Sequence, residues 1–116
     1  METKFYYLRD KANRPLVTVC LAEDAYGDYF RGVAICSPKD NPVKRIGRGI
    51  ALGRAIRGIR NKVHSDIVVR DEAYSVLRKV DGASVPHHYK SSPVSIMTQL
   101  EIKLLDNSKE KMKSNG

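Results

Sequence analysis

The sequence contains no tryptophan, and no run of apolar residues approaches the roughly 20 that a membrane-spanning helix needs. The first ten residues have neither the apolar stretch nor the small-residue cleavage site of a secretory signal. These two absences predict a cytoplasmic protein with no membrane partner.

Cysteine and histidine are also scarce, with two and three residues respectively. Cys20 and Cys36 lie in apolar segments, and such a pair in a reducing compartment is more often buried as thiols than bridged. His64, His87 and His88 do not combine with the cysteines into the paired spacing of zinc ligands. We predict core thiols, no metal site and no cofactor.

The motifs of common catalytic sites are missing as well. No glycine is followed by Lys and then Ser or Thr, as a Walker loop requires. The run 47–53 is similar to a dinucleotide fingerprint, but its third glycine comes one residue late and we expect no parallel strand-helix-strand unit around it. Cys36 and Ser37 have no histidine tied to them by sequence. We therefore predict no catalytic residues and a protein that is not an enzyme.

What the sequence does contain is concentrated positive charge. Residues 44–70 hold eight Lys or Arg residues and one acid, Asp66, whereas the segments before and after are almost neutral; the whole chain carries a formal charge of +8. A basic stripe of this kind is typical of proteins that bind nucleic acid, because each phosphate contact releases counterions. A charged helix face can also be no more than a solvated surface.

The pattern of apolar residues predicts a single α+β domain over residues 1–105 and a flexible tail over 106–116. Its elements are expected in the order βββααβ, with a four-stranded, mainly antiparallel sheet and a basic helix packed on one face. The expected strands cover Lys4–Arg9, Leu16–Glu23, Tyr29–Ser37 and Val94–Leu105, and the helices cover Pro42–Asn61 and Ile67–Val80.

The basic helix has a clear start signal, since Asp40 or Asn41 can cap it and Pro42 suits its first position. An apolar arc predicts which side packs on the sheet; it comprises Ile46, Ile50, Leu52, Ile56 and Ile59, with Gly49 and Gly53 inside it. Gly47 and Gly58 fall on the basic side instead. There they would either let a phosphate backbone come close or mark a local break in the helix.

The candidate binding residues are the cations of this segment together with the lysine just before it. We predict that they contact DNA or RNA phosphates, or the carboxylates of an acidic host-protein surface, and a homodimer through sheet edges is a further possibility. They are Lys39, Lys44, Arg45, Arg48, Arg54, Arg57, Arg60 and Lys62.

Parts of the chain resemble two known classes of protein. Three strands followed by a helix with a basic start, at Ser37–Arg48, resemble the second half of a double-stranded-RNA-binding domain, which implies phosphate contacts across a groove. The runs Arg31–Asp40 and Ile46–Ala55 resemble small proteins encoded by bacteriophages. That class includes inhibitors of host defence such as anti-CRISPR proteins, so this resemblance implies that the target in the host cytoplasm is a host protein or its nucleic-acid channel.

Overall fold

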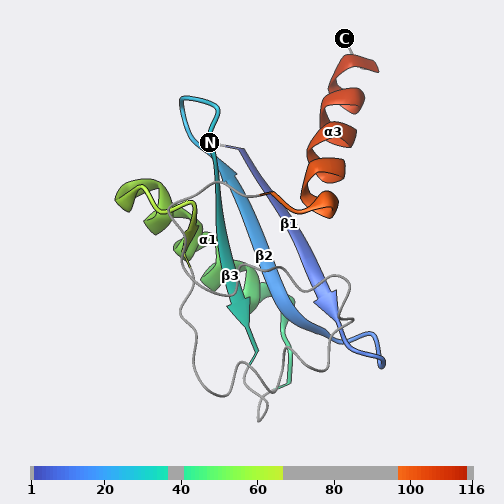
Figure 1. Ribbon diagram of the computed structural model, residues 1–116. Coiled ribbons are helices and arrows are strands. Elements are labelled where there is room, and N and C mark those ends of the chain that lie inside the picture. Colours follow the sequence, from blue (N-terminus) through green and yellow to red (C-terminus); the bar gives the residue numbers. More distant parts are fainter. Residues whose placement is uncertain (1, 37–40, 67–96, 115–116) are drawn as a thin grey trace.

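The computed structural model describes residues 2–36, 41–66 and 97–114, and all statements below concern these residues (Figure 1). Three strands come first: β1 (Glu2–Arg9), β2 (Pro15–Glu23) and β3 (Tyr29–Ile35). They are followed by α1 (Lys44–Asn61), β4 (Ser65–Asp66) and α3 (Gln99–Ser114). The α+β class is confirmed. Neither described helix combines the length and the apolar composition that crossing a bilayer requires.

The four strands form one mixed sheet in the order β1-β2-β3-β4. The β1–β2 and β2–β3 pairs are antiparallel, as predicted, whereas β4 runs parallel to β3. Side chains fix both turns of the meander. Asp10 accepts hydrogen bonds from the backbone and the side chain of Arg14, and Asp24 accepts from the amides of Tyr26 and Asp28.

The predicted fourth strand over 94–105 is wrong, because a helix begins at Gln99. Thr98 and Glu101 form a reciprocal capping box: the Glu101 amide donates to Thr98 Oγ1 over 3.2 Å, and the Thr98 amide donates to Glu101 Oε1 over 3.0 Å. The helix continues through residues 107–114, so this part of the predicted tail is helical. The predicted helix over 67–80 lies outside the described residues.

The middle strand β2 is covered on both faces, since every residue from Leu16 to Ala22 is buried. Val17, Val19 and Leu21 pack with the start of α3 on one face of the sheet. Cys20 and Ala22 pack with α1 on the other. Successive side chains of β2 alternate between these two faces. In Figure 1, α1 lies behind the sheet and α3 leaves it beside β1.

α1 packs on the sheet through small residues, and the predicted packing face is therefore wrong. Ala51 and Ala55 are fully buried over Gly32, where an added Cβ would overlap the helix backbone. Gly47 lies against Thr18, and Gly58 lies against Phe30 and the chain that follows the helix. The large residues of the predicted arc lie outside the interface between α1 and the sheet, because the close approach of helix and sheet leaves no room for them. Ile46 is 61% exposed and Ile50 45% exposed, while Leu52 and Ile59 pack only at the border.

On the other face, a buried ion pair joins β3 to α3. Arg31 donates to the Glu101 carboxylate through Nε and Nη2, and Nε lies 2.7 Å from Oε2. The two side chains are only 4% and 0% exposed. Tyr6 donates its hydroxyl to Glu101 Oε2 over 2.9 Å, and Arg31 Nη1 lies 3.4 Å from Ser65 Oγ. Strands β1, β3 and β4 and helix α3 thus meet in one polar cluster.

Changing glycine to alanine is expected to have opposite effects on the free energy of unfolding in α1 and in β3. Gly49 and Gly53 face open space, so Gly49→Ala and Gly53→Ala should each raise the free energy of unfolding by about 0.5 to 1 kcal/mol. Gly32→Ala should lower it by about 2 kcal/mol or more, because α1 must move away. Denaturant titration measures all three. Stabilisation by Gly32→Ala, or destabilisation by the two helix variants, would contradict this packing.

The Arg31–Glu101 pair is expected to set the response of stability to acid. Burial alone would raise the pKa of Glu101, but the hydrogen bonds and charge of Arg31 outweigh it and hold that pKa below its usual value. A depressed folded pKa contributes stability above the ordinary glutamate pKa of about 4.3, and the contribution is lost as pH falls through the folded value. Glu101→Gln should cost about 3 to 5 kcal/mol near neutral pH, since it leaves Arg31 buried and unpaired. The stability of the Glu101→Gln variant should also fall less steeply than that of the wild type below pH 4. Equal acid slopes in urea titrations of the two proteins would refute this role.

Candidate nucleic-acid interface

The basic helix α1 begins at Lys44, two residues later than predicted. Val43 occupies the N-cap in an extended conformation, and its apolar side chain cannot bond the first helical amides. The helix ends at Asn61, and its C-cap, Lys62, adopts a left-handed conformation (φ 59°) and donates its amide to Gly58 O. No acidic residue occurs between Lys44 and Asn61. Both the backbone dipole and the side chains therefore leave the start of α1 electropositive.

Two of the predicted binding residues hold α1 to the sheet. Arg54 is half-buried and donates from Nη1 to Val33 O over 2.6 Å. Arg57 is bonded to Asp66 in β4, with Nε 2.6 Å from Oδ2. Hydrogen bonding to Asp66 and the charge of that carboxylate raise the pKa of Arg57 further. These two arginines have structural partners within the chain.

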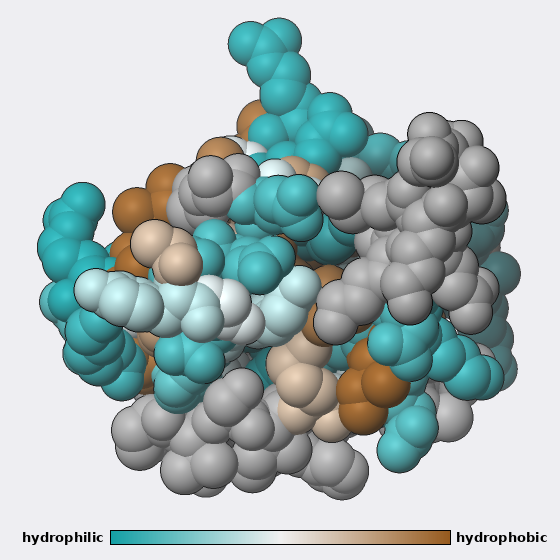
Figure 2. Space-filling view, turned by 90° about the horizontal axis from the view of Figure 1, so that it is seen from above, coloured by the Kyte–Doolittle hydropathy of each residue, from teal (hydrophilic) through white to brown (hydrophobic). Residues whose placement is uncertain are grey.

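The other cations of α1 and its C-cap are exposed. They fall into two groups, one in the first turns and one at the C-terminal end: Lys44, Arg45 and Arg48, and Arg60 and Lys62. At about 1.5 Å per residue, Lys44 and Arg60 lie about 24 Å apart along the helix. Lys39 lies outside the described residues. Seen from above, hydrophobic residues form small groups separated by hydrophilic ones (Figure 2).

Gly49 and Gly53 occupy the outer side of α1 between these two groups. Apart from the adjoining residues and backbone of the helix itself, no atom of the described residues lies within 4 Å of a Cβ added at either position. The sequence left two readings open for Gly47 and Gly58, close approach of a phosphate backbone or a local break, but α1 is continuous and Gly47 lies against Thr18 and Gly58 against Phe30. Gly47 and Gly58, not Gly49 and Gly53, are therefore the glycines that pack inward. Backbone exposed at Gly49 and Gly53 lets a partner come close to the helix axis.

Sequence reasoning missed two residues of β1 that lie beside the first turn of α1. Lys44 Nζ is 4.9 Å from the centroid of the Tyr7 ring, and Arg9 Cζ is 5.6 Å from the same centroid. Arg9 lies in a nearly neutral part of the sequence, so local charge density gave no signal. Alternation along β1 was the available signal, because it places Tyr7 on the same face as Phe5, which packs on the α1 side.

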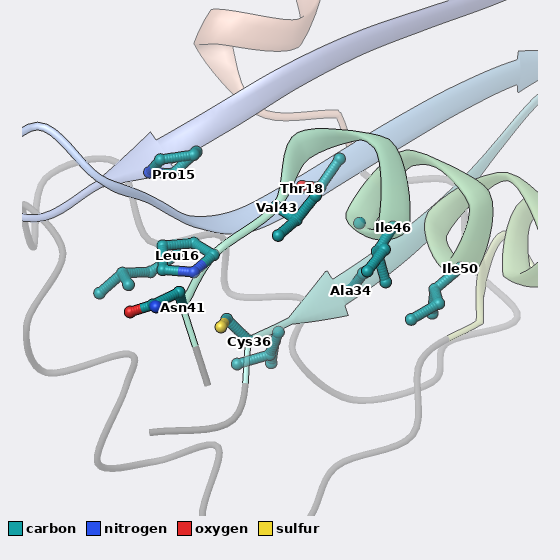
Figure 3. A pocket seen from close by; sticks show the side chains of 12 residues that line it. Pro15, Leu16, Thr18, Ala34, Cys36, Asn41, Val43, Ile46 and Ile50 are labelled. Atoms are coloured by element: carbon teal, nitrogen blue, oxygen red, sulfur yellow. The ribbon is translucent and has the colours of Figure 1, made fainter. Parts of the chain in front are cut away.

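An apolar hollow of about 500 Å³ lies between the start of α1 and the adjoining ends of β2 and β3 (Figure 3). Val43, Ile46 and Ile50 border it from the helix, and all three are exposed. Leu16 and Cys36 border it from the strands. Cys36 is half-buried there, while Cys20 is fully buried, and burial raises the pKa of Cys20 to about 11. The prediction of core thiols holds for Cys20.

The run 47–53 lies inside α1, not in a loop before it. The chain does form a parallel unit of β3, α1 and β4, contrary to the prediction. A dinucleotide fingerprint nevertheless needs its glycines in the turn that precedes the helix, where they approach the pyrophosphate. Within the described ranges, no three His, Cys, Asp or Glu side chains converge as metal ligands. His64 is stacked on Phe30, with its Nδ1 2.9 Å from Tyr29 O.

No family model matches this chain, and no curated protein or solved structure does so either. The resemblances to double-stranded-RNA-binding domains and to bacteriophage proteins therefore stay predictions.

The division of the arginines into structural and exposed ones can be tested by stability. Arg54→Gln should lower the free energy of unfolding by about 1.5 kcal/mol, because a charged hydrogen bond to Val33 O is lost. Arg48→Gln removes the same charge from an exposed position of the same helix and should change it by less than about 0.5 kcal/mol. Thermal or urea unfolding of the pair measures the difference. Equal stabilities would show that Arg54 has no structural role.

Proposed function

We propose that this protein binds the phosphate backbone of nucleic acid, without catalysis, through the outer surface of α1. The observation that carries the proposal is the exposure of five cations on one helix and its C-cap: Lys44, Arg45, Arg48, Arg60 and Lys62. The helix has no acid of its own, and Asp66, the next acid after the helix in the sequence, is bonded to Arg57. The five charges are therefore available to an external anion.

Three further features support a phosphate ligand. Counterion release makes each cation–phosphate contact a source of affinity, and four or five such contacts suffice for substantial salt-dependent binding. The N-terminal amides and the helix dipole of α1 add to the attraction near Lys44. Gly49 and Gly53 have no side chains on the helix surface between the two charged groups, so a sugar-phosphate chain can lie close to the helix.

The composition of α1 argues for contacts to the backbone instead of the bases. The helix contains no aromatic residue, and the chain contains no tryptophan, so it offers no platform for stacking bases. Nor does α1 carry Asn or Gln before its last residue, the side chains that read adenine in a groove. We expect binding that depends strongly on salt and weakly on base sequence.

A second candidate function follows from the bacteriophage resemblance, namely inhibition of a host defence protein. The observation that favours it is the apolar hollow beside the cations of the first turns. Val43, Ile46 and Ile50 are 50%, 61% and 45% exposed there. An acidic host protein with an apolar projection would complement both the hollow and Lys44, Arg45 and Arg48.

The proposal is tested by titrating labelled double-stranded DNA, single-stranded DNA and double-stranded RNA with the protein at several salt concentrations. The double variant Arg45→Glu, Arg48→Glu should lower affinity about tenfold or more and reduce the slope of log K against log salt by about 2. The matched control is Lys4→Glu, Lys103→Glu, which makes the same charge change at two exposed positions outside α1.

The control should bind almost as well as the wild type. If both double variants lose affinity equally, the effect is one of net charge and α1 is not the interface. If the wild type binds none of the three nucleic acids at low salt, the proposal is refuted. Capture of a host protein by the wild type, lost in the Arg45→Glu, Arg48→Glu variant, would then favour the second candidate.

A further inference from the structure

We infer that Arg9, Lys44 and Tyr7 form a phosphate-binding cluster that joins β1 to the first turn of α1. The inference rests on the proposed function and extends it, because Arg9 and Tyr7 lie outside the basic segment. It places a phosphate contact at the junction of strand and helix.

The geometry brings two cations from distant parts of the sequence to one ring. Lys44 Nζ lies 4.9 Å and Arg9 Cζ lies 5.6 Å from the centroid of Tyr7. Attraction between each cation and the ring quadrupole holds the two side chains in place. A bound anion therefore meets charges whose freedom is already reduced, which lowers the entropic cost of binding.

The fold fixes this arrangement through β2. Tyr7 pairs with Thr18 across the β1–β2 ladder, and Thr18 lies directly against Gly47 of α1. A larger residue at position 47 would push the helix away from the strands. The close contact at Gly47 thus sets the first turn of α1, with Lys44, over the end of β1. Arg48, one turn further along, extends the positive surface from the same flank of the helix.

The charges of this cluster lack compensation within the described residues. Arg31 is paired with Glu101, Arg57 with Asp66, and Arg14 with Asp10. Neither Arg9 nor Lys44 has a carboxylate partner in the ranges 2–36, 41–66 and 97–114; Arg9 donates only to the neutral carbonyl of Asn13, over 2.9 Å. Two like charges beside one ring repel each other, and an anion bound near them would offset that repulsion.

The position of Lys44 over the ring also indicates what kind of contact the cluster makes. A base that stacked on Tyr7 would have to compete with Lys44 for the ring. Phosphodiester oxygens can instead accept hydrogen bonds from both cations while the ring keeps its contacts. The cluster is therefore expected to contact phosphates of any base sequence.

The experiment uses fluorescence titration of the full chain with labelled duplexes of two different base compositions, each at several salt concentrations. Arg9→Gln should weaken binding to both duplexes by the same factor, about three- to tenfold, and lower the salt slope by about 1. The control is Lys4→Gln, which removes the same charge from the same strand. Lys4 shares a face with Tyr6 and Leu8, which pack on the side opposite α1, so binding should stay within about twofold of the wild type.

Changes at Tyr7 test the ring without altering the charge. Tyr7→Leu should weaken binding about two- to fivefold with an unchanged salt slope, because Lys44 and Arg9 lose their support. Tyr7→Phe keeps the ring and should restore wild-type affinity. Thermal unfolding of each variant confirms that the affinities compare folded proteins.

The outcomes separate this inference from the proposed function. If Arg9→Gln binds as well as Lys4→Gln while Arg45→Glu, Arg48→Glu abolishes binding, the cluster is refuted and the α1 interface stands. A loss at Arg9 that differs between the two duplexes would also refute it, since phosphate contacts do not distinguish base sequence. Absence of all nucleic-acid binding would overturn both proposals.

Discussion

The close approach of α1 to β3 at Gly32 is the constraint on which the other contacts depend. Because an added Cβ would overlap the helix backbone, only glycine lets Ala51 and Ala55 reach the sheet. The neighbouring residue, Arg31, points to the opposite face and binds Glu101 at the start of α3. β4 pairs with the same two residues of β3. One dipeptide in the sheet therefore holds both described helices and the parallel strand.

This packing also explains how α1 presents its charge. A helix that lies on the sheet through glycine and alanine places all its long side chains at its borders or on its outer side. Those at the border beside β3 and β4 reach the sheet, as Arg54 does at Val33 O and Arg57 does at Asp66. At the other border Lys44 covers Tyr7 of β1. The outward-facing cations remain exposed.

The sequence predicted the meander and the existence of α1, since alternation in β2 and the signals around Pro42 are local and strong. It misidentified the packing face because hydrophobicity favoured Ile46 and Ile50, whereas backbone proximity selected Gly47, Ala51 and Ala55. Alternating apolar residues before Leu105 concealed the capping box of Thr98 and Glu101, which was the better signal. For the proposed site, charge density pointed to α1, but the placement of Tyr7 and Arg9 beside Lys44 depends on tertiary contacts that local patterns do not contain.

Gly32 must face α1 and Arg31 must face Glu101 on the other side of the sheet, and this affects how the strands align during folding. A slip of β3 by one residue against β2 would exchange the faces of the two side chains. Arginine would then collide with α1, and Glu101 would be buried opposite a glycine without a counter-charge. A misaligned sheet would thus be destabilised by steric overlap on one face and by an unpaired buried charge on the other. The adjacent residues Arg31 and Gly32 therefore both favour the native alignment.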